Sequence, residues 1–257
     1  MSFLKSIVRR AADFYFLPVR RSQNLRTYLQ GSLLTDPEQH LTSAMRYIKK
    51  HVTPAPDEIV IDVGGANGGT ATLFAAAFPG HKVFCVEPNA RMLPLLKKAE
   101  AEHPTVVVKP LALGRQGGEA TLHVTANNLS SSLNEIDQAE LKQTPSDFQA
   151  RLHEDQQITV RVSTLDEEFP NQQVLLIKLD TQGTEAEILK GGPRTLERTR
   201  FVLVEMNNHH LYRNTCQYYE VDELLRNHSF KLADIIVTYR GDDGVSEYDA
   251  LYRNLNL

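Results

Sequence analysis

A run of β-forming apolar residues that enters a glycine-rich turn limits the possible folds of this chain more than any other feature. Residues 59–70 read IVIDVGGANGGT, and the helix-forming segment 71–78 follows directly. Glycines in such a turn let the backbone approach a ligand closely, and the free N–H groups at the start of the helix face that ligand. A second apolar run, 83–87, also ends in an acid, which is where a ribose hydroxyl pair is usually held. These two segments predict a nucleotide-binding corner.

The order of apolar segments predicts an α/β fold, a doubly wound sheet that is mostly parallel. We expect strands at 58–63, 82–87, 105–110, 120–124, 158–162, 174–180, 201–205, 231–239 and 247–254, with helices at 69–78, 89–102, 184–190 and 220–228. The segment 174–180 is almost continuously apolar, as expected at the centre of a parallel sheet. Residues 126–157 are polar and irregular, which indicates an active-site loop and a surface helix. The final pair of strands predicts an antiparallel last strand.

Residues 1–52 are expected to form an N-terminal helical cap, and residues 53–257 the main domain. A Pro-rich segment, 53–56, marks the boundary. The cap carries a cluster of basic residues, namely Arg9, Arg10, Arg20, Arg21 and Arg26. The alternative to a cap is therefore a basic amphipathic helix that makes a peripheral contact with a membrane or a partner.

Charge and composition narrow the range of functions. A formal net charge of −4 gives no support for a nucleic-acid partner. No run approaches the roughly 18 apolar residues of a membrane span, and Arg9 and Arg10 interrupt any signal-peptide core. We therefore expect a cytoplasmic protein. Cys85 and Cys216 are the only cysteines, and Cys85 is expected to be an unpaired core residue.

The glycine-rich turn is compatible with two classes of cofactor. Taken as G-x-A-x-x-G over Gly64, Ala66 and Gly69, it matches the fingerprint of an NAD-dependent oxidoreductase. However, Asp62 lies two positions before the first glycine, and an acid at that position is typical of sites for S-adenosylmethionine (SAM). Glu87 could hold a ribose in either class, or it could satisfy backbone N–H groups at the next helix.

Polar residues after two later strands are candidates for catalysis. Asp180 lies at the carboxyl end of the central strand, where α/β sheets hold their ligands, and Lys178 is predicted to share its face. The alternative for Asp180 is an N-cap of the following helix. His209 could act as a general base near neutral pH. Asp180 and Glu205 could bind a divalent cation, but two acids on separate strands are weak evidence and we predict no metal.

Over residues 57–254 the chain resembles the FkbM-type SAM-dependent methyltransferases. The most specific match is IKLDTQGTE at 177–185, continued by ILKG at 188–191; further matches lie at 61–68, 86–89, 111–114, 131–133, 163–166, 204–205 and 248–252. The resemblance implies a class I methyltransferase fold, which is Rossmann-like, and methyl transfer to a hydroxyl of a sugar, glycan, polyketide or related metabolite. The chain departs from the family at one position. The family often has Asn at the position of Ala66, two residues after Gly64, whereas in this chain the Asn comes one residue later, at Asn67.

The resemblance also implies roles for individual residues. Residues expected to bind the cofactor are Asp62, Gly64 and Gly68 around the methionine part, Glu87 at the ribose, and Ala112 and Leu113 beside the adenine. Ala66, Asn67 and Pro88 are also expected to bind the cofactor. Asp180 or His209 would accept the proton of the acceptor hydroxyl. The alternatives are an NAD-dependent oxidoreductase and a non-catalytic SAM-binding scaffold subunit. A base methyltransferase is disfavoured, since the segment 180–183 lacks the Pro-Pro-aromatic element that stacks a flipped base.

Overall fold

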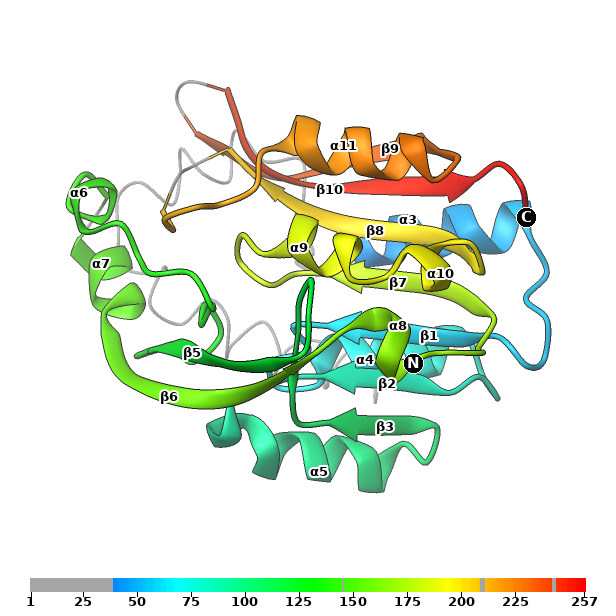
Figure 1. The fold of residues 1–257 in the computed structure, drawn as a ribbon, viewed down its shortest axis with the longest axis horizontal. Coiled ribbons are helices and arrows are strands. Elements are labelled where there is room, and N and C mark those ends of the chain that lie inside the picture. The colour runs from blue at the N-terminus through cyan, green and yellow to red at the C-terminus, as the bar shows by residue number, and fades with distance from the viewer. Residues whose placement is uncertain (1–38, 145, 209–210, 242–243) are drawn as a thin grey trace, which may run out of the picture.

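A seven-stranded sheet forms the centre of the protein in a computed structural model, which describes residues 39–144, 146–208, 211–241 and 244–257 (Figure 1). Its strands are β1 (Ile59–Val63), β2 (Val83–Val86), β3 (Val106–Lys109), β7 (Val174–Leu179), β8 (Thr199–Asn207), β9 (Phe230–Gly241) and β10 (Gly244–Asn254). They lie in the order β3-β2-β1-β7-β8-β10-β9. The first five are parallel to one another, whereas β10 runs antiparallel to both β8 and β9. The predicted doubly wound sheet with an antiparallel last strand is confirmed.

Helices cover both faces of this sheet, and each face has its own apolar core. One face packs against α3 (Gln39–His51), α4 (Gly69–Ala77), the 3₁₀ turn η2 (Ala90–Met92) and α5 (Leu93–Glu102). The other packs against α8 (Leu165–Glu168), α9 (Glu185–Lys190), α10 (Pro193–Leu196) and α11 (Tyr218–Asn227) (Figure 1). Every residue of β7 is buried between the two layers, which explains its continuous apolar sequence.

Helix α3 belongs to the same core as the central sheet. Leu41, Ala44, Met45 and Ile48 recur at helical spacing and are buried with residues of β1, β7 and β8. The part of the predicted N-terminal cap that the structure describes therefore packs directly on the main domain. Residues 1–38 lie outside the described residues.

A second, three-stranded sheet lies beside the first. It contains β4 (Ala112–Leu113), β5 (Gly118–Thr125) and β6 (Glu154–Ser163) in the order β4-β6-β5, with the short helices α6 (Gln138–Leu141) and α7 (Ser146–Leu152) between β5 and β6. The prediction of an irregular segment up to residue 157 was wrong at its end, because 154–157 already belong to β6. These polar residues form a strand since they pair with β5 along its length.

Two further expectations concern cysteines and membrane spans. Cys85 and Cys216 are both free, and Cys85 is buried in β2 as predicted. Within the described ranges, no helix is both long and apolar enough to cross a membrane.

Candidate active site

The glycine-rich turn after β1 brings the backbone against the turn that follows β7. Gly64 has a φ of +81°, and a Cβ atom there would lie 1.8 Å from the carbonyl oxygen of Asp180. A Cβ atom at Gly65 would lie 2.1 Å from the sulfur of Cys85. Only glycine fits these positions, and the two strand ends consequently meet at one edge of the sheet, where α/β proteins bind ligands.

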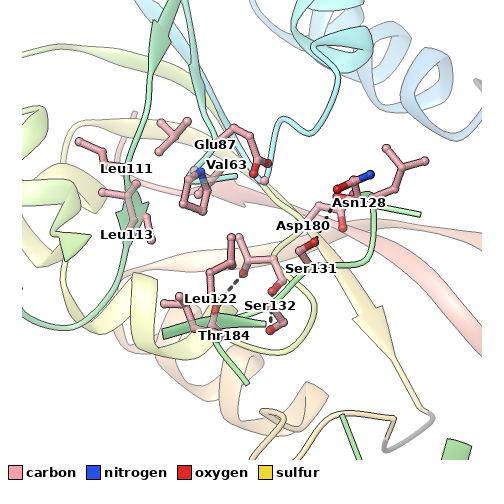
Figure 2. Close-up of a pocket in the computed structure, with 17 residues that line it drawn as sticks. Val63, Glu87, Leu111, Leu113, Leu122, Asn128, Ser131, Ser132, Asp180 and Thr184 are labelled. Atoms are coloured by element: carbon pink, nitrogen blue, oxygen red, sulfur yellow. Dashed lines mark hydrogen bonds between the residues drawn. The ribbon is translucent and has the colours of Figure 1, made fainter. Parts of the chain in front are cut away.

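A cleft of about 510 Å³, partly open to solvent, lies over these strand ends (Figure 2). Polar groups come from the turns after β1, β2 and β7, and an apolar wall comes from residues 111–113 and the small sheet. The predicted residues that line the cleft are Gly64, Glu87, Pro88, Ala112, Leu113 and Asp180. The fold therefore brings together six of the predicted residues.

Glu87 is buried at the end of β2, with 7% of its surface exposed. Its Oε2 accepts a hydrogen bond from the N–H of Ala66 at 2.9 Å, and its Oε1 accepts one from the N–H of Asn89 at 2.7 Å. Burial raises the pKa of Glu87 to about 7, although the two N–H groups favour the ionised form. Each oxygen keeps a second lone pair, so the carboxylate can satisfy the backbone and still accept ligand hydroxyls. The two interpretations of Glu87 are compatible.

Ala66, Asn67 and Gly68 are not among the residues that line the cleft, and they support the turn instead. Ala66 holds Glu87 through its backbone, as described above. The side-chain oxygen of Asn67 accepts from the N–H of Gly69 at 3.0 Å. Gly68, with a φ of +83°, is the N-cap of α4. These three residues stabilise the turn between β1 and α4, which in turn positions the residues that line the cleft.

Asp62 also lies beneath the cleft and does not line it. Its side chain is fully buried in β1, and neither carboxylate oxygen has a hydrogen bond of ordinary geometry to the residues that the structure describes. Burial raises the pKa of Asp62 to about 7, while the nearby Lys178 ammonium and the N–H of Ala71 favour the ionised form. Asp62 therefore acts on the cleft through charge and packing.

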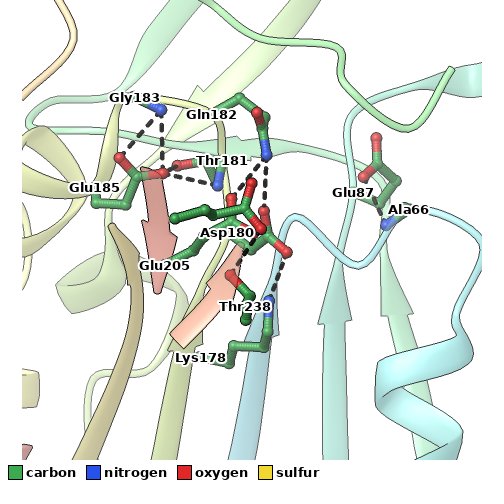
Figure 3. Close-up of polar contacts among 11 residues, drawn as sticks. Ala66, Glu87, Lys178, Asp180, Thr181, Gln182, Gly183, Glu185, Glu205 and Thr238 are labelled. Carbon is green, nitrogen blue, oxygen red and sulfur yellow. Dashed lines mark hydrogen bonds and ion pairs between the residues drawn. The ribbon is translucent and has the colours of Figure 1, made fainter. Parts of the chain in front are cut away.

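Asp180 is the centre of a polar network after β7 (Figure 3). Its Oδ2 accepts from the ammonium of Lys178 at 2.7 Å, which confirms that these two residues share a face. The amide nitrogen of Gln182 donates both to Asp180 Oδ1 at 3.1 Å and to Glu205 Oε2 at 2.9 Å. The side chain of Asp180 keeps 29% of its surface exposed despite its dense surroundings, because it borders the cleft. The N-cap of α9 is Thr184, so the capping alternative for Asp180 was wrong.

The two acids of this network have opposite electrostatic environments. Burial alone would raise the pKa of Asp180, but the Lys178 ammonium and hydrogen bonds from Glu205 and Gln182 hold it below its usual range. Burial and the negative charges of Asp180 and Glu247 raise the pKa of Glu205 well above its usual range. The network therefore favours the ionised form of Asp180, which is paired with Lys178, and makes Glu205 the acid that holds a proton more tightly.

Glu185 and Gln182 contribute in ways that the sequence patterns did not reveal. Glu185, in the first turn of α9, accepts from the N–H and hydroxyl of Thr181 at 2.9 and 3.0 Å and from the N–H of Gly183 at 3.1 Å. Gln182 has a φ of +59°, and this left-handed backbone conformation costs a residue other than glycine about 1–2 kcal/mol. Its hydrogen bonds to two carboxyl groups offset that strain. Only the turn geometry makes these roles visible.

The loop after β5 closes one side of the cleft. The hydroxyl of Ser132 donates to the carbonyl of Gln182 at 3.0 Å, and the amide of Asn134 donates to the carbonyl of Gly183 at 3.1 Å. Asn128 has a φ of +59° and lines the cleft, and its buried Oδ1 has no hydrogen bond among the described residues. The predicted active-site loop thus carries a hydrogen-bond acceptor, Asn128 Oδ1, to which a ligand can donate.

A second pocket of about 390 Å³ adjoins the same turn. It is lined by Gln182, Gly183, Glu185, Glu205, Met206, Asn207, Tyr212, Thr215, Cys216 and Tyr218. Asp180 and Thr181 line the first cleft while Gln182 and Gly183 line the second pocket, so one turn contributes to both. His209, the other predicted catalytic residue, follows β8 but lies outside the described residues.

The fold and the site together define a class I methyltransferase. A dinucleotide-binding sheet has six parallel strands in the order 3-2-1-4-5-6. Here the last strand in the chain, β10, inserts antiparallel between β8 and β9. The cleft lies over the carboxyl ends of β1, β2 and β7, at the corner that the glycine-rich turn predicts.

Comparison with known proteins identifies the family. Residues 62–232 match the Methyltransferase FkbM domain. A curated relative, 2-O-methyltransferase NoeI from Sinorhizobium fredii (strain NBRC 101917 / NGR234), is 26% identical over 248 residues, which are 90% of this chain and 98% of that protein. Because the family match covers more than half of the chain, the chain belongs to the FkbM methyltransferase family, and the resemblance seen in the sequence is confirmed.

Solved structures of methyltransferases are also similar to this chain. Methyltransferase FkbM from Methylobacillus flagellatus KT has a TM-score of 0.48 at 15% identity, and the match covers 96% of this chain and 60% of that chain. Magnesium protoporphyrin IX methyltransferase (ChlM) from Synechocystis PCC 6803, solved with bound SAM, has a TM-score of 0.43 at 9% identity, with 87% and 86% of the two chains covered.

Proposed function

We propose that this protein is an O-methyltransferase that transfers the methyl group of SAM to a hydroxyl of a sugar, glycan, polyketide or related small metabolite. The observation that carries the proposal is the cleft over β1, β2 and β7, where a glycine-rich turn, a buried carboxylate and an apolar wall come together. The relative NoeI, a 2-O-methyltransferase by name, supports oxygen as the atom that is methylated.

The residues of the cleft fit SAM by their chemistry. Glu87 can accept ribose hydroxyls through its remaining lone pairs, and Ala112 and Leu113 offer apolar surface for a purine. The ionised Asp180 is complementary to a ligand that carries positive charge, and the buried Oδ1 of Asn128 can accept from an ammonium group. When bound, SAM supplies a methyl group that is already activated by its positive sulfur.

The main task of the protein is then to position the acceptor. Holding the acceptor oxygen in line with an activated methyl group supplies much of the acceleration of such a reaction. The second pocket, which shares the turn 180–183 with the first cleft, is suited to hold the acceptor. Asp180 lines the first cleft next to this shared turn, and His209 remains a predicted acceptor of the hydroxyl proton.

Two other functions predict different behaviour. An NAD-dependent oxidoreductase would bind NAD and transfer hydride, which the family membership disfavours. A non-catalytic scaffold subunit would bind SAM without turnover. Both are distinguished from the proposed function by following the methyl group.

The test uses SAM labelled in its methyl group, with methyl hexopyranosides and simple diols as acceptors. We expect label to enter an acceptor in a bond that resists alkali, because an ether survives conditions that hydrolyse an ester. The Glu87→Ala variant serves as the comparison with weakened cofactor binding. Tight SAM binding without transfer to any acceptor would favour the scaffold function, and NAD-dependent oxidation of the same acceptors would contradict methyl transfer.

A further inference from the structure

We propose that Glu205 is the catalytic residue that removes the proton from the acceptor hydroxyl during methyl transfer. This inference rests on the proposed function. It gives Glu205 the role of proton acceptor, which the sequence analysis predicted for Asp180 or His209. Glu205 lies in β8 and lines the second pocket, next to the turn that also borders the SAM cleft. Its side chain is therefore in contact with the space that an acceptor would occupy.

Gln182 fixes the position of this carboxyl group. Its amide nitrogen bridges Glu205 Oε2 at 2.9 Å and Asp180 Oδ1 at 3.1 Å (Figure 3). The bridge occupies one oxygen of each acid. The positive φ of Gln182 shows that the turn is held in an unfavourable conformation to make it.

Asp180 is the poorer base of the pair because Lys178 neutralises it. The buried Lys178 ammonium lies 2.7 Å from Asp180 Oδ2, and an acid whose anion is stabilised in this way binds a proton weakly. Glu205 has no comparable ion pair among the described residues, so its anion is the more basic one. The arrangement separates the roles of the two acids: Asp180 supplies a fixed negative charge, and Glu205 carries the proton.

Charged groups from several elements surround Glu205. Lys178 acts on it from β7, Asp180 from the turn after β7 and Glu247 from β10, and the hydroxyl of Tyr212 is near enough to sense its charge. Asp62 and Asp249 lie around the same Lys178 ammonium. One buried cation for this many carboxyl groups leaves an excess of negative charge, which favours a proton on Glu205 in the resting protein.

The reaction balances with this single proton transfer. Glu205 first loses its resting proton to solvent. The O–H bond of the acceptor then breaks and its proton moves to the Glu205 carboxylate, while the oxygen forms a bond to the methyl carbon. The bond between that carbon and sulfur breaks, and its electron pair stays on sulfur. The products are a methyl ether, a thioether and a protonated Glu205.

The first test needs no acceptor. Infrared spectroscopy of the ligand-free protein detects protonated carboxyl groups, and the difference between wild type and Glu205→Gln isolates the signal of Glu205. We expect a protonated carboxyl signal at neutral pH that Glu205→Gln removes and that the control Glu187→Gln, an exposed acid of α9, retains. A Glu205 that is already ionised in acidic solution would overturn the proposal.

The second test measures methyl transfer to methyl hexopyranosides across pH. Glu205→Gln should lower kcat by about 100-fold or more while leaving the affinity for S-adenosylhomocysteine unchanged. Glu247→Gln removes a like charge near Glu205, and it should move the pH at which activity rises to a lower value. A Glu205→Gln enzyme that retains its kcat, or a wild type that loses activity to a chelator and regains it with Mg²⁺, would overturn the role. If wild type methylates none of these probes, the proposed function fails on them, and the infrared result still decides whether Glu205 holds the proton.

Discussion

Replacing Gly64 by Ala tests whether the close approach of two turns builds the cofactor cleft, and Gly80 provides a matched control. Gly64 and Gly80 have φ angles of +81° and +86°, so an Ala at either position meets the same backbone strain of about 1–2 kcal/mol. Nothing lies within 4 Å of a Cβ at Gly80, whereas a Cβ at Gly64 would lie 1.8 Å from the carbonyl oxygen of Asp180. The two variants therefore differ only in the contact between the turns.

Gly80→Ala should lower the free energy of unfolding by about 1–2 kcal/mol and leave ligand binding unchanged. Gly64→Ala adds an overpacking cost of about 1–3 kcal/mol, which gives about 2–5 kcal/mol in total. It should also weaken the binding of S-adenosylhomocysteine by about tenfold or more, which corresponds to ~1.4 kcal/mol, because the turn after β1 must move away from Asp180.

Urea unfolding measures the first quantity and isothermal calorimetry the second. Our expectation is a larger loss of stability for Gly64→Ala than for Gly80→Ala, accompanied by a loss of affinity in Gly64→Ala alone. Equal losses of stability in the two variants, with the affinity of Gly64→Ala intact, would refute it.

The further predictions concern three acids, Glu87, Asp180 and Asp62. Glu87→Ala should weaken binding of S-adenosylhomocysteine by about 1–3 kcal/mol in calorimetry, through loss of a charge-assisted hydrogen bond. Because the pKa of Glu87 is about 7 and hydroxyl donors favour its ionised form, wild-type affinity should rise as pH increases through that value, and Glu87→Gln should remove this dependence. Asp180→Asn should lower turnover more than cofactor affinity, whereas equal losses in kinetics and calorimetry would make Asp180 a cofactor ligand. Burial raises the pKa of Asp62 from 3.8 to about 7 in the folded protein, so the free energy of unfolding should fall as pH rises between these values; urea unfolding of Asp62→Asn should show a smaller fall.

Much of the fold could be predicted because its signals are local. The apolar run of β7 and the glycine-rich turn after β1 each determine their structure within a few residues, and parallel strands place their carboxyl ends at a common edge. That is why Glu87 and Asp180, which are distant in the sequence, could be assigned to one site before their cleft was seen. The extension of β6 over 154–157 escaped prediction because these polar residues gain their strand structure only by pairing with β5.

The parts of the site that escaped prediction depend on contacts between distant segments. Gln182 lies in the segment that matches the family most specifically, yet that match does not show its role, which follows from a left-handed turn that places its amide between two acids. Asp62 was expected around the methionine part of the cofactor because of its spacing from Gly64, yet its strand position buries it beneath the cleft. Sequence spacing identifies the element on which an acid lies, and packing decides whether that acid reaches a ligand.

The central claim is that the cleft binds SAM, and calorimetry of wild-type protein with S-adenosylhomocysteine, with NAD as a parallel titrant, tests it most directly. We predict saturable, one-to-one binding of S-adenosylhomocysteine that Gly64→Ala weakens, and no binding of NAD. Binding of NAD alone, or binding of S-adenosylhomocysteine that neither Gly64→Ala nor Glu87→Ala changes, would contradict the assignment of this cleft.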